Sequence, residues 1–341
     1  MRLNKNLISK LLNHMQIPPG KARFLYFLNQ VQIILKKAEE SQSPALLIYN
    51  ENMRTPLFML EALTRLYKKM QDKKKFKKLN VRFKEIEDLL GEIDFYDGFH
   101  KEFTEYKNMP KPITDHLKNK MDEKAKALNH VLKKEKWIGK HNKRIEKIFK
   151  KLDKIDWPDE EEDAMDLLSI YRYYINKINE NYKNNLIFKD IEADVHELRR
   201  ELRWLSIYPQ ALLGLIQFKE DNELPDFLNK YLTSEIVNSP YNLMPEPGAS
   251  QHLILINKNY FYALSWMIDA LGTLKDSGLT IMALEQSLRS VYNISSGTEQ
   301  LAYSICNDSQ MKIPEILNQS QQLAKTFFEE NILENLISDS E

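Results

Sequence analysis

Apolar residues recur every three or four positions along most of this chain of 341 residues, the spacing that gathers them on one face of an α-helix. Thr55 and Pro56 are typical of a helix start, with Thr55 as the N-cap and Pro56 in the first turn. No segment alternates convincingly as a strand does, although the short apolar runs at 44–49 and 252–256 fit either a strand or a buried connector. The pattern therefore predicts an all-α fold. The predicted helical segments are 21–41, 55–70, 76–103, 113–134, 142–155, 164–182, 195–208, 259–292 and 313–337.

The segment Trp-Pro-Asp-Glu-Glu-Glu-Asp at 157–163 is the clearest break in this pattern. The sign of the charge changes there, and Asp159 is placed to cap a new helix whose first turn is acidic. The longest irregular stretch, rich in Pro, Asn and Ser, follows later, at 221–250. We therefore divide the chain into two helical halves, residues 1–157 and 158–341.

The net charge of zero conceals an asymmetry along the chain. Residues 61–157 contain 27 Lys and Arg against 17 Asp and Glu, and the rest of the chain carries the compensating acidic excess. Two runs, 68–84 and 133–144, concentrate the basic residues. A basic middle indicates either an anionic partner or an acidic face of the same protein, and composition leaves both open.

The segment Val-His-Glu-Leu-Arg-Arg-Glu-Leu-Arg at 195–203 has the most specific charge pattern. Each residue of a helix is rotated by about 100° from the last, so its basic side chains fall within one arc of about 100°, opposite an apolar face. Guanidinium groups grip phosphate oxygens, and several on one face suit a repeated anion. The same pattern also fits the solvated side of an ordinary amphipathic helix. The side chains in the arc are His196, Arg199, Arg200 and Arg203.

A weak internal repeat links the two halves. Residues 87–98 resemble residues 268–278, and each segment reads as a helix that ends in Leu-Gly. Gly91 and Gly272 then hold equivalent places, where glycine serves tight packing or a turn.

Taken together, these features resemble the CHAD domain, the conserved histidine α-helical domain. That family pairs two helical-bundle halves by internal pseudo-symmetry, and each half carries a His-x-x-Arg-x-x-x-Lys/Arg helix and a downstream Leu-Gly-x-x-x-Asp segment. His196, Arg199 and Arg203 match the first motif. The second motif is matched by Leu271, Gly272, Lys275 and Asp276. The resemblance implies that the two halves form one CHAD-like domain with pseudo-twofold symmetry.

This sequence departs from the family pattern, most of all in its first half. There Glu51 takes the place of the His, Arg54 that of the Arg, and Phe58 that of the next basic residue. Gly91 is followed by Asp94 and Phe95, not by a basic residue and Asp. In the second half, Trp204 and Ser206 stand where the family usually has further basic residues. The chain is thus similar to a divergent member whose anion site is reduced.

The resemblance implies that the chain binds inorganic polyphosphate through a basic cleft, without catalysis and without a cofactor. If His196 takes part, affinity should rise as the pH falls from about 8 to 6, because a protonated imidazole adds charge. The binding residues that follow are His196, Arg199, Arg200, Arg203, Lys275, Arg54, Arg65, Lys68 and Lys69.

Two other functions stay open: a helical scaffold that has lost the anion site, and a weak nucleic-acid binder that uses the basic middle. A scaffold needs an exposed apolar patch, whereas nucleic-acid binding favours exposed aromatic residues among the basic ones. An enzyme is not expected, because the sequence contains no acid–base constellation, phosphate-binding glycine loop or metal-ligand spacing. A single cysteine, Cys306, excludes an internal disulfide, and no apolar run suits a signal peptide or a membrane span. We therefore expect a cytoplasmic protein.

Overall fold

A computed structural model describes residues 17–70, 72–139, 143–183, 186–219, 224–248, 250–306 and 310–337. Lys140 of the second basic run lies outside these residues, as does most of the N-terminal segment on which the expectation of no signal peptide depends. No helix in the described ranges has both the length and the apolar character that crossing a membrane requires.

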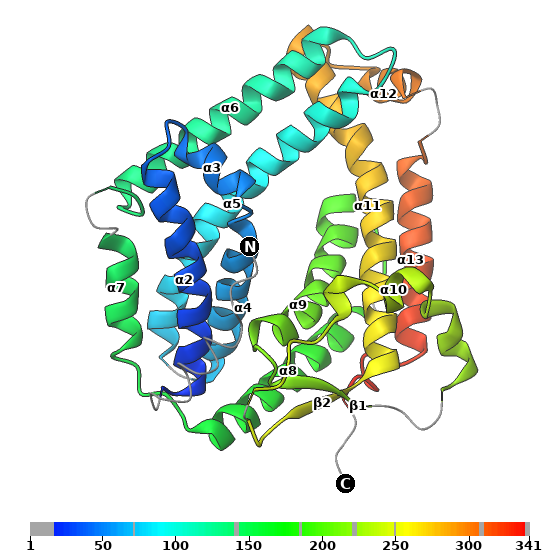
Figure 1. Cartoon of the computed structure of the whole chain (residues 1–341). Coiled ribbons are helices and arrows are strands. Elements are labelled where there is room, and N and C mark those ends of the chain that lie inside the picture. Colours follow the sequence, from blue (N-terminus) through cyan, green and yellow to red (C-terminus); the bar gives the residue numbers. More distant parts are fainter. Residues whose placement is uncertain are drawn as a thin grey trace.

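Helices form almost all of the regular structure, which confirms the all-α prediction (Figure 1). The first half contains α2 (Pro19–Glu39), α3 (Pro44–Asn50), α4 (Arg54–Met70), α5 (Lys73–Thr104), α6 (Lys111–Lys134) and α7 (Lys143–Leu152). The second half begins with α8 (Glu160–Tyr182), the π-helical turn η1 (Ile191–His196) and α9 (Glu197–Ala211). Three short helical turns follow: η2 (Asp226–Tyr231), α10 (Ser234–Val237) and η3 (Pro240–Asn242). The last helices are α11 (Lys258–Tyr292), α12 (Thr298–Ile305) and α13 (Ile313–Glu329). The pseudo-twofold relation between the halves stays a prediction.

The two ambiguous apolar runs resolve differently. Residues 44–49 lie in α3, whereas the other run enters a strand, β2 (Ile254–Asn257). This strand pairs in parallel with β1 (Ile216–Lys219), with Ile216 opposite Ile254. The longest irregular stretch connects the two strands, and the turns η2, α10 and η3 interrupt it.

The helix starts follow local hydrogen bonds. The Asp159 carboxylate accepts a hydrogen bond from the Glu162 amide at 3.0 Å, as its predicted role as N-cap requires. The expected Thr55 cap is wrong, because α4 already begins at Arg54 and the Thr55 amide donates to the Asn52 carbonyl in the preceding turn.

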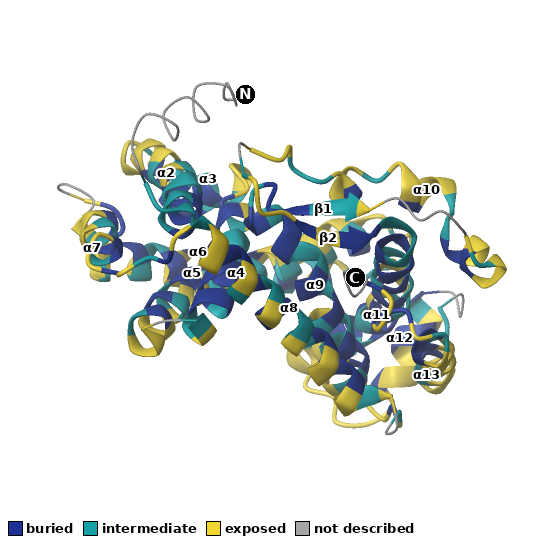
Figure 2. Cartoon of the chain, turned by 90° about the horizontal axis from the view of Figure 1, so that it is seen from below, coloured by how far each residue is buried: buried dark blue, intermediate teal, exposed yellow. Residues whose placement is uncertain are grey.

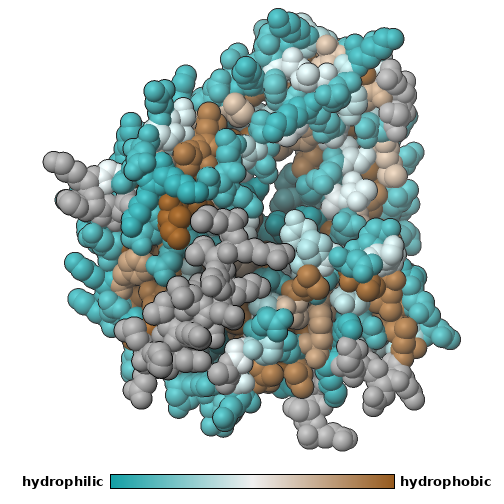
Figure 3. All heavy atoms as spheres, viewed as in Figure 1, coloured by the Kyte–Doolittle hydropathy of each residue, from teal (hydrophilic) through white to brown (hydrophobic). Residues whose placement is uncertain are grey.

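The helices surround an opening whose lining comes mainly from α5 and α11 (Figure 1), and the space-filling view of Figure 3 shows it as a hollow. At one end α4 packs against α9, and the main hydrophobic core continues there from α2 through α4, α8 and α9 to α11 and α13. At the other end a smaller core joins Phe103 of α5 and Ile113 of α6 to Leu284 of α11. Figure 2 shows the buried positions on the inward faces of these helices. Both halves therefore contribute to each core.

A buried polar network ties the halves together beneath α4. Arg23 of α2 donates to the Tyr67 hydroxyl at 2.6 Å and forms an ion pair with Asp163 of α8. The Tyr67 hydroxyl in turn donates to Asp163 at 2.7 Å, and Arg23 Nε donates to the Leu212 carbonyl at 3.2 Å. The Asp163 side chain is 1% exposed, so the acid at the sequence break neutralises a buried arginine from the other half.

Candidate functional site

Two arginine–glycine crossings flank the contact between α4 and α9. Arg54, at the start of α4, lies across Gly91 of α5, and a Cβ atom at Gly91 would be 2.9 Å from Arg54 Nη2. Arg199 of α9 lies across Gly272 of α11 in the same way, with its Nε 2.9 Å from a Cβ there. Both helices continue through their glycines, to Thr104 and Tyr292. The expectation that each helix ends at Leu-Gly is therefore wrong: the glycine makes room for an arginine.

At the first crossing, carboxylates engage the arginine. Arg54 Nε donates to Glu87 at 2.7 Å, and Nη1 donates to Asp94 at 2.9 Å. The Glu87 side chain is only 7% exposed, so its charge depends on this partner. Arg54 therefore holds two negative charges in place.

At the second crossing, no carboxylate among the described residues engages the arginine. Arg199 Nε donates to the Ile268 carbonyl at 3.0 Å, and the described residues provide no hydrogen bond for its two terminal nitrogens. Burial lowers the pKa of Arg199, and the nearby carboxylates of Asp276 and Asp269 only partly oppose that effect. This guanidinium is held by one neutral acceptor and keeps unused donors.

Arg203 completes the group of arginines. Its Cζ lies 4.9 Å from the centre of the Phe58 ring, and Arg54 Cζ lies 5.3 Å from the same ring. Within the described residues the Arg203 guanidinium has no hydrogen-bond acceptor. Burial lowers its pKa, and the charges of Arg199 and Arg54 lower it further. We call Arg54, Arg199 and Arg203 the guanidinium cluster; it draws on both halves of the chain.

His196 and Lys275 lie beside this cluster at the opening. His196 ends the π-helical turn that leads into α9, and its Nδ1 is 3.8 Å from a Glu192 oxygen, too far for a hydrogen bond. Burial lowers the pKa of His196, and Lys275, Arg200 and Arg199 lower it further, against an opposing effect of Glu192. Lys275 forms an ion pair with Asp276, its neighbour in the sequence.

The opening itself has a volume of about 920 Å³ and a lining of mixed charge. Apolar side chains such as Phe95, Phe99 and Met282 share this lining with the charged ones. Carboxylates outnumber the permanent cations, so the lining differs from the uniformly basic cleft that we expected. The charged residues that line it are Arg54, Lys275, Asp94, Glu102, Glu192 and Asp276, together with His196.

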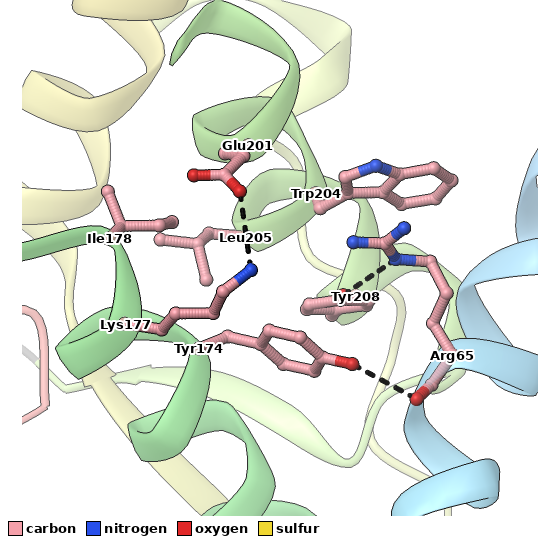
Figure 4. A pocket seen from close by; sticks show the side chains of 8 residues that line it. All are labelled: Arg65, Tyr174, Lys177, Ile178, Glu201, Trp204, Leu205 and Tyr208. Atoms are coloured by element: carbon pink, nitrogen blue, oxygen red, sulfur yellow. Dashed lines mark hydrogen bonds and ion pairs between the residues drawn. The ribbon is translucent and has the colours of Figure 1, made fainter. Parts of the chain in front are cut away.

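The remaining predicted binding residues lie elsewhere. Arg200 is exposed and pairs with Glu197 at 2.6 Å. Arg65 lies at the junction of α4, α8 and α9, where its guanidinium packs 4.5 Å from the centre of the Trp204 ring and its Nε points to the Tyr208 hydroxyl (Figure 4).

Lys68 and Lys69 follow Arg65 on α4. Lys69 lies over the Tyr173 ring at 4.1 Å, and burial lowers the pKa of Lys68, with further lowering by the charges of Arg65 and Lys69. The predicted binding residues therefore do not converge on one cleft: Arg65, Lys68 and Lys69 lie on nearly the same face of α4 as Arg54 but three to four turns further along the helix, about 16–23 Å away.

Sequence reasoning missed two parts of the site. Phe58 appears in the sequence as a departure from a basic pattern, yet its ring is the platform for Arg54 and Arg203. Glu87 precedes Gly91 by one helical turn, so the two residues share a face of α5, and this spacing could have indicated that Glu87 also faces Arg54.

The described residues contain no group of three or more His, Cys, Asp or Glu side chains that could hold a metal ion. In comparisons with known proteins, no family model, no curated protein and no solved structure matches the chain.

Proposed function

We propose that the chain is a non-enzymatic polyanion-binding protein of the CHAD type, and that inorganic polyphosphate contacts the guanidinium cluster. The site is centred on Arg203 and Arg199, at the α4–α9 end of the opening.

The observation that carries the proposal is the state of Arg203. Arg203 is half-buried, and its guanidinium keeps donors that no acceptor among the described residues engages, so they are available to an anion. Around it lie the Phe58 ring and the like charges of Arg199 and Arg54, which the more distant influence of Glu87 and Tyr241 only partly opposes. A bound phosphate would supply acceptors and negative charge to both Arg203 and Arg199.

The carboxylates of the opening restrict where the ligand lies. Glu192, Glu102 and Asp276 would repel a polyanion that passed through the opening. We therefore place the ligand along the cluster, where Arg54 is already neutralised by Glu87 and Asp94 and the unused donors belong to Arg199 and Arg203.

The test is a titration with long-chain polyphosphate at several salt concentrations. The Arg199→Ala/Arg203→Ala double variant should lose about tenfold or more in affinity, since each charge-assisted contact contributes about 1–3 kcal/mol. Arg200→Ala is the matched control, because it removes a charge from the same helix at an exposed position paired with Glu197. Binding by wild type should weaken steeply as salt rises.

Absence of binding at low salt would contradict the ligand, and equal binding by the double variant and wild type would contradict the site. The pH dependence gives a second readout. Because the pKa of His196 is lowered in the free protein, its contribution should appear below about pH 6.5, a lower range than the sequence alone suggested. His196→Gln should remove that part of the pH dependence.

The scaffold function remains as a second candidate because of an exposed apolar pair on η3 and the loop after it. Tyr241 is 83% exposed and Leu243 is 65% exposed, and Tyr241 lies close enough to Arg203 to influence its charge. A protein partner would use this pair, so Tyr241→Ser should leave polyphosphate affinity nearly unchanged if the first candidate is right.

Nucleic-acid binding is less favoured, since Trp204 and Tyr171 are buried and the Tyr173 ring already lies under Lys69. Tyr241 is an exposed ring beside Arg203, so Tyr241→Ser tests this candidate as well.

A further inference from the structure

The first basic run lies beside helix α7, which begins at the end of the second basic run in the sequence. At one end, Lys75 Nζ on α5 donates to the carbonyl of Lys154, just after α7, at 3.2 Å. At the other end, the ring of Phe83 on α5 lies 6.5 Å from that of Trp137, just before α7. Helix α7 therefore runs antiparallel to the first three turns of α5, on the side of the molecule away from α11 (Figure 1).

This arrangement aligns cations from both helices. Residues four apart on α5 and three, then four, apart on α7 share a helix face. Burial lowers the pKa of Lys151, and the charges of the other four cations of this group lower it further, in agreement with the antiparallel arrangement of the two helices. We call the group the cationic seam: Lys78 and Arg82 on α5, and Arg144, Lys147 and Lys151 on α7.

Arg82 is the unsatisfied member of the seam. Its Nη1 is fully covered and has no hydrogen-bond partner among the described residues. Burial lowers the pKa of Arg82 and the Arg144 charge lowers it further, while Glu135 opposes them. A covered donor of this kind is destabilising unless an acceptor reaches it.

Arg144 is fixed beside it. Its Nε donates to the Glu135 carbonyl at 2.8 Å and its Nη2 pairs with the Glu135 carboxylate, while the Arg144 side chain is 14% exposed. Glu135 is the one acid among the groups that influence Arg82 and Lys151, and it is already engaged. The seam therefore keeps a local excess of positive charge.

We propose that the cationic seam is a binding site for a phosphate group, either inorganic phosphate or the terminal group of a phosphomonoester. A tetrahedral dianion placed between Arg82 and Lys151 would screen the like charges, and a turn of the Arg82 side chain toward it would bring the covered Nη1 to an acceptor. The seam has no exposed aromatic residue among its described members and neighbours on α5 and α7, so the contact is to phosphate and not to a base. This site is separate from the guanidinium cluster and does not depend on it.

The experiment measures thermal unfolding and binding of wild type with inorganic phosphate and with phenyl phosphate, against chloride at equal ionic strength. Wild type should be stabilised by at least one of the two probes, and the probe that binds identifies the source of the phosphate group. Arg82→Gln and Lys151→Gln should each lose about tenfold in affinity, and both should melt at a higher temperature than wild type without phosphate, because a repulsion is removed. A merely structural Arg82 would give a lower melting temperature instead.

Lys84→Gln is the matched control, since Lys84 is also on α5 but pairs with Asp88 and lies near Glu61. It should bind phosphate as wild type does. No response of wild type to either probe overturns the proposal, as does phosphate binding that survives in the Arg82→Gln/Lys151→Gln double variant. Phosphate binding lost only in the Arg199→Ala/Arg203→Ala variant also overturns it, and that result would leave the proposed function intact.

Discussion

The first and second arginine–glycine crossings share a geometry and differ in charge. In each, an arginine from one helix lies across a glycine in the middle of the next. At the first crossing, two carboxylates engage the arginine; at the second, one backbone carbonyl does so. The same local packing can therefore be a closed ion-pair network in one half and an open donor set in the other.

The difference separates the features of this motif that packing requires from the features that a bound ligand would require. Packing requires the glycine and the length of the arginine, and both halves keep these. Unused donors are not needed for packing, and only the second crossing keeps them. Three predictions test this contrast.

The largest difference in stability between the two crossings should appear when the arginine of each is replaced by alanine. Arg54→Ala leaves Glu87 buried without its partner, so we expect a loss of about 3–5 kcal/mol in the free energy of unfolding. Arg199→Ala removes one hydrogen bond to a carbonyl and should cost about 1 kcal/mol. Urea unfolding measures both, and Arg54→Ala/Glu87→Gln should recover part of the loss. Equal losses for the two single variants would remove the contrast.

A smaller effect should appear in the pH dependence of stability. Glu61 adds a further carboxyl group near the first crossing, where burial, followed by the Glu87 charge, raises its pKa to about 8 from 4.5. Between these two values the folded protein holds a proton that the unfolded chain has lost, so stability falls as pH rises toward about 8. We expect wild type to lose roughly 2–4 kcal/mol relative to Glu61→Gln between pH 5 and 9. Glu85→Gln, at an exposed position of α5, is the control; parallel curves for wild type and Glu61→Gln would contradict the assignment.

The smallest effect should come from the glycines. Alanine in a helix is favoured over glycine by about 1 kcal/mol, so Gly98→Ala, where nothing lies within 4 Å, should stabilise α5 by that amount. Gly272→Ala should be nearly neutral, because Arg199 can move away, but polyphosphate affinity should fall several-fold. Gly91→Ala should lower stability by about 1 kcal/mol, because two carboxylates hold Arg54 in place. If Gly91→Ala and Gly272→Ala behave alike, the two arginines are equally mobile.

The periodicity of the sequence was enough to predict the helices, and local chemistry was enough to place the Asp159 cap. It could not predict that residues 254–257 form a strand, because a parallel pair depends on a partner 38 residues away, at Ile216. Periodicity also predicted helices that run through Gly91 and Gly272, at 76–103 and 259–292, but the Leu-Gly pattern was wrongly taken as a helix end because the arginine that occupies the space of each missing side chain is a tertiary neighbour.

The candidate site was predictable in part: matching the two halves placed Arg54 opposite Arg199, and each of these arginines crosses one of the two glycines predicted to be equivalent. A helical face joins Arg199 to Arg203, and spacing alone reveals it. The cluster depends on Arg54 from a helix more than 140 residues earlier, and its closure depends on Glu87. Arg65, Lys68 and Lys69 share a helix with Arg54 but lie three to four turns further along it, where α8 and α9 provide the neighbours of Arg65.

The ion pair of Arg23 with Asp163 bears on how the polypeptide can be divided. The pair joins residues on opposite sides of the connection between α7 and α8, and both members are buried. A polypeptide cut in that connection would leave an uncompensated guanidinium in one piece and an uncompensated carboxylate in the other. We therefore expect the two pieces to be insoluble or unfolded when made separately and to complement one another when made together, in the manner of a split reporter protein.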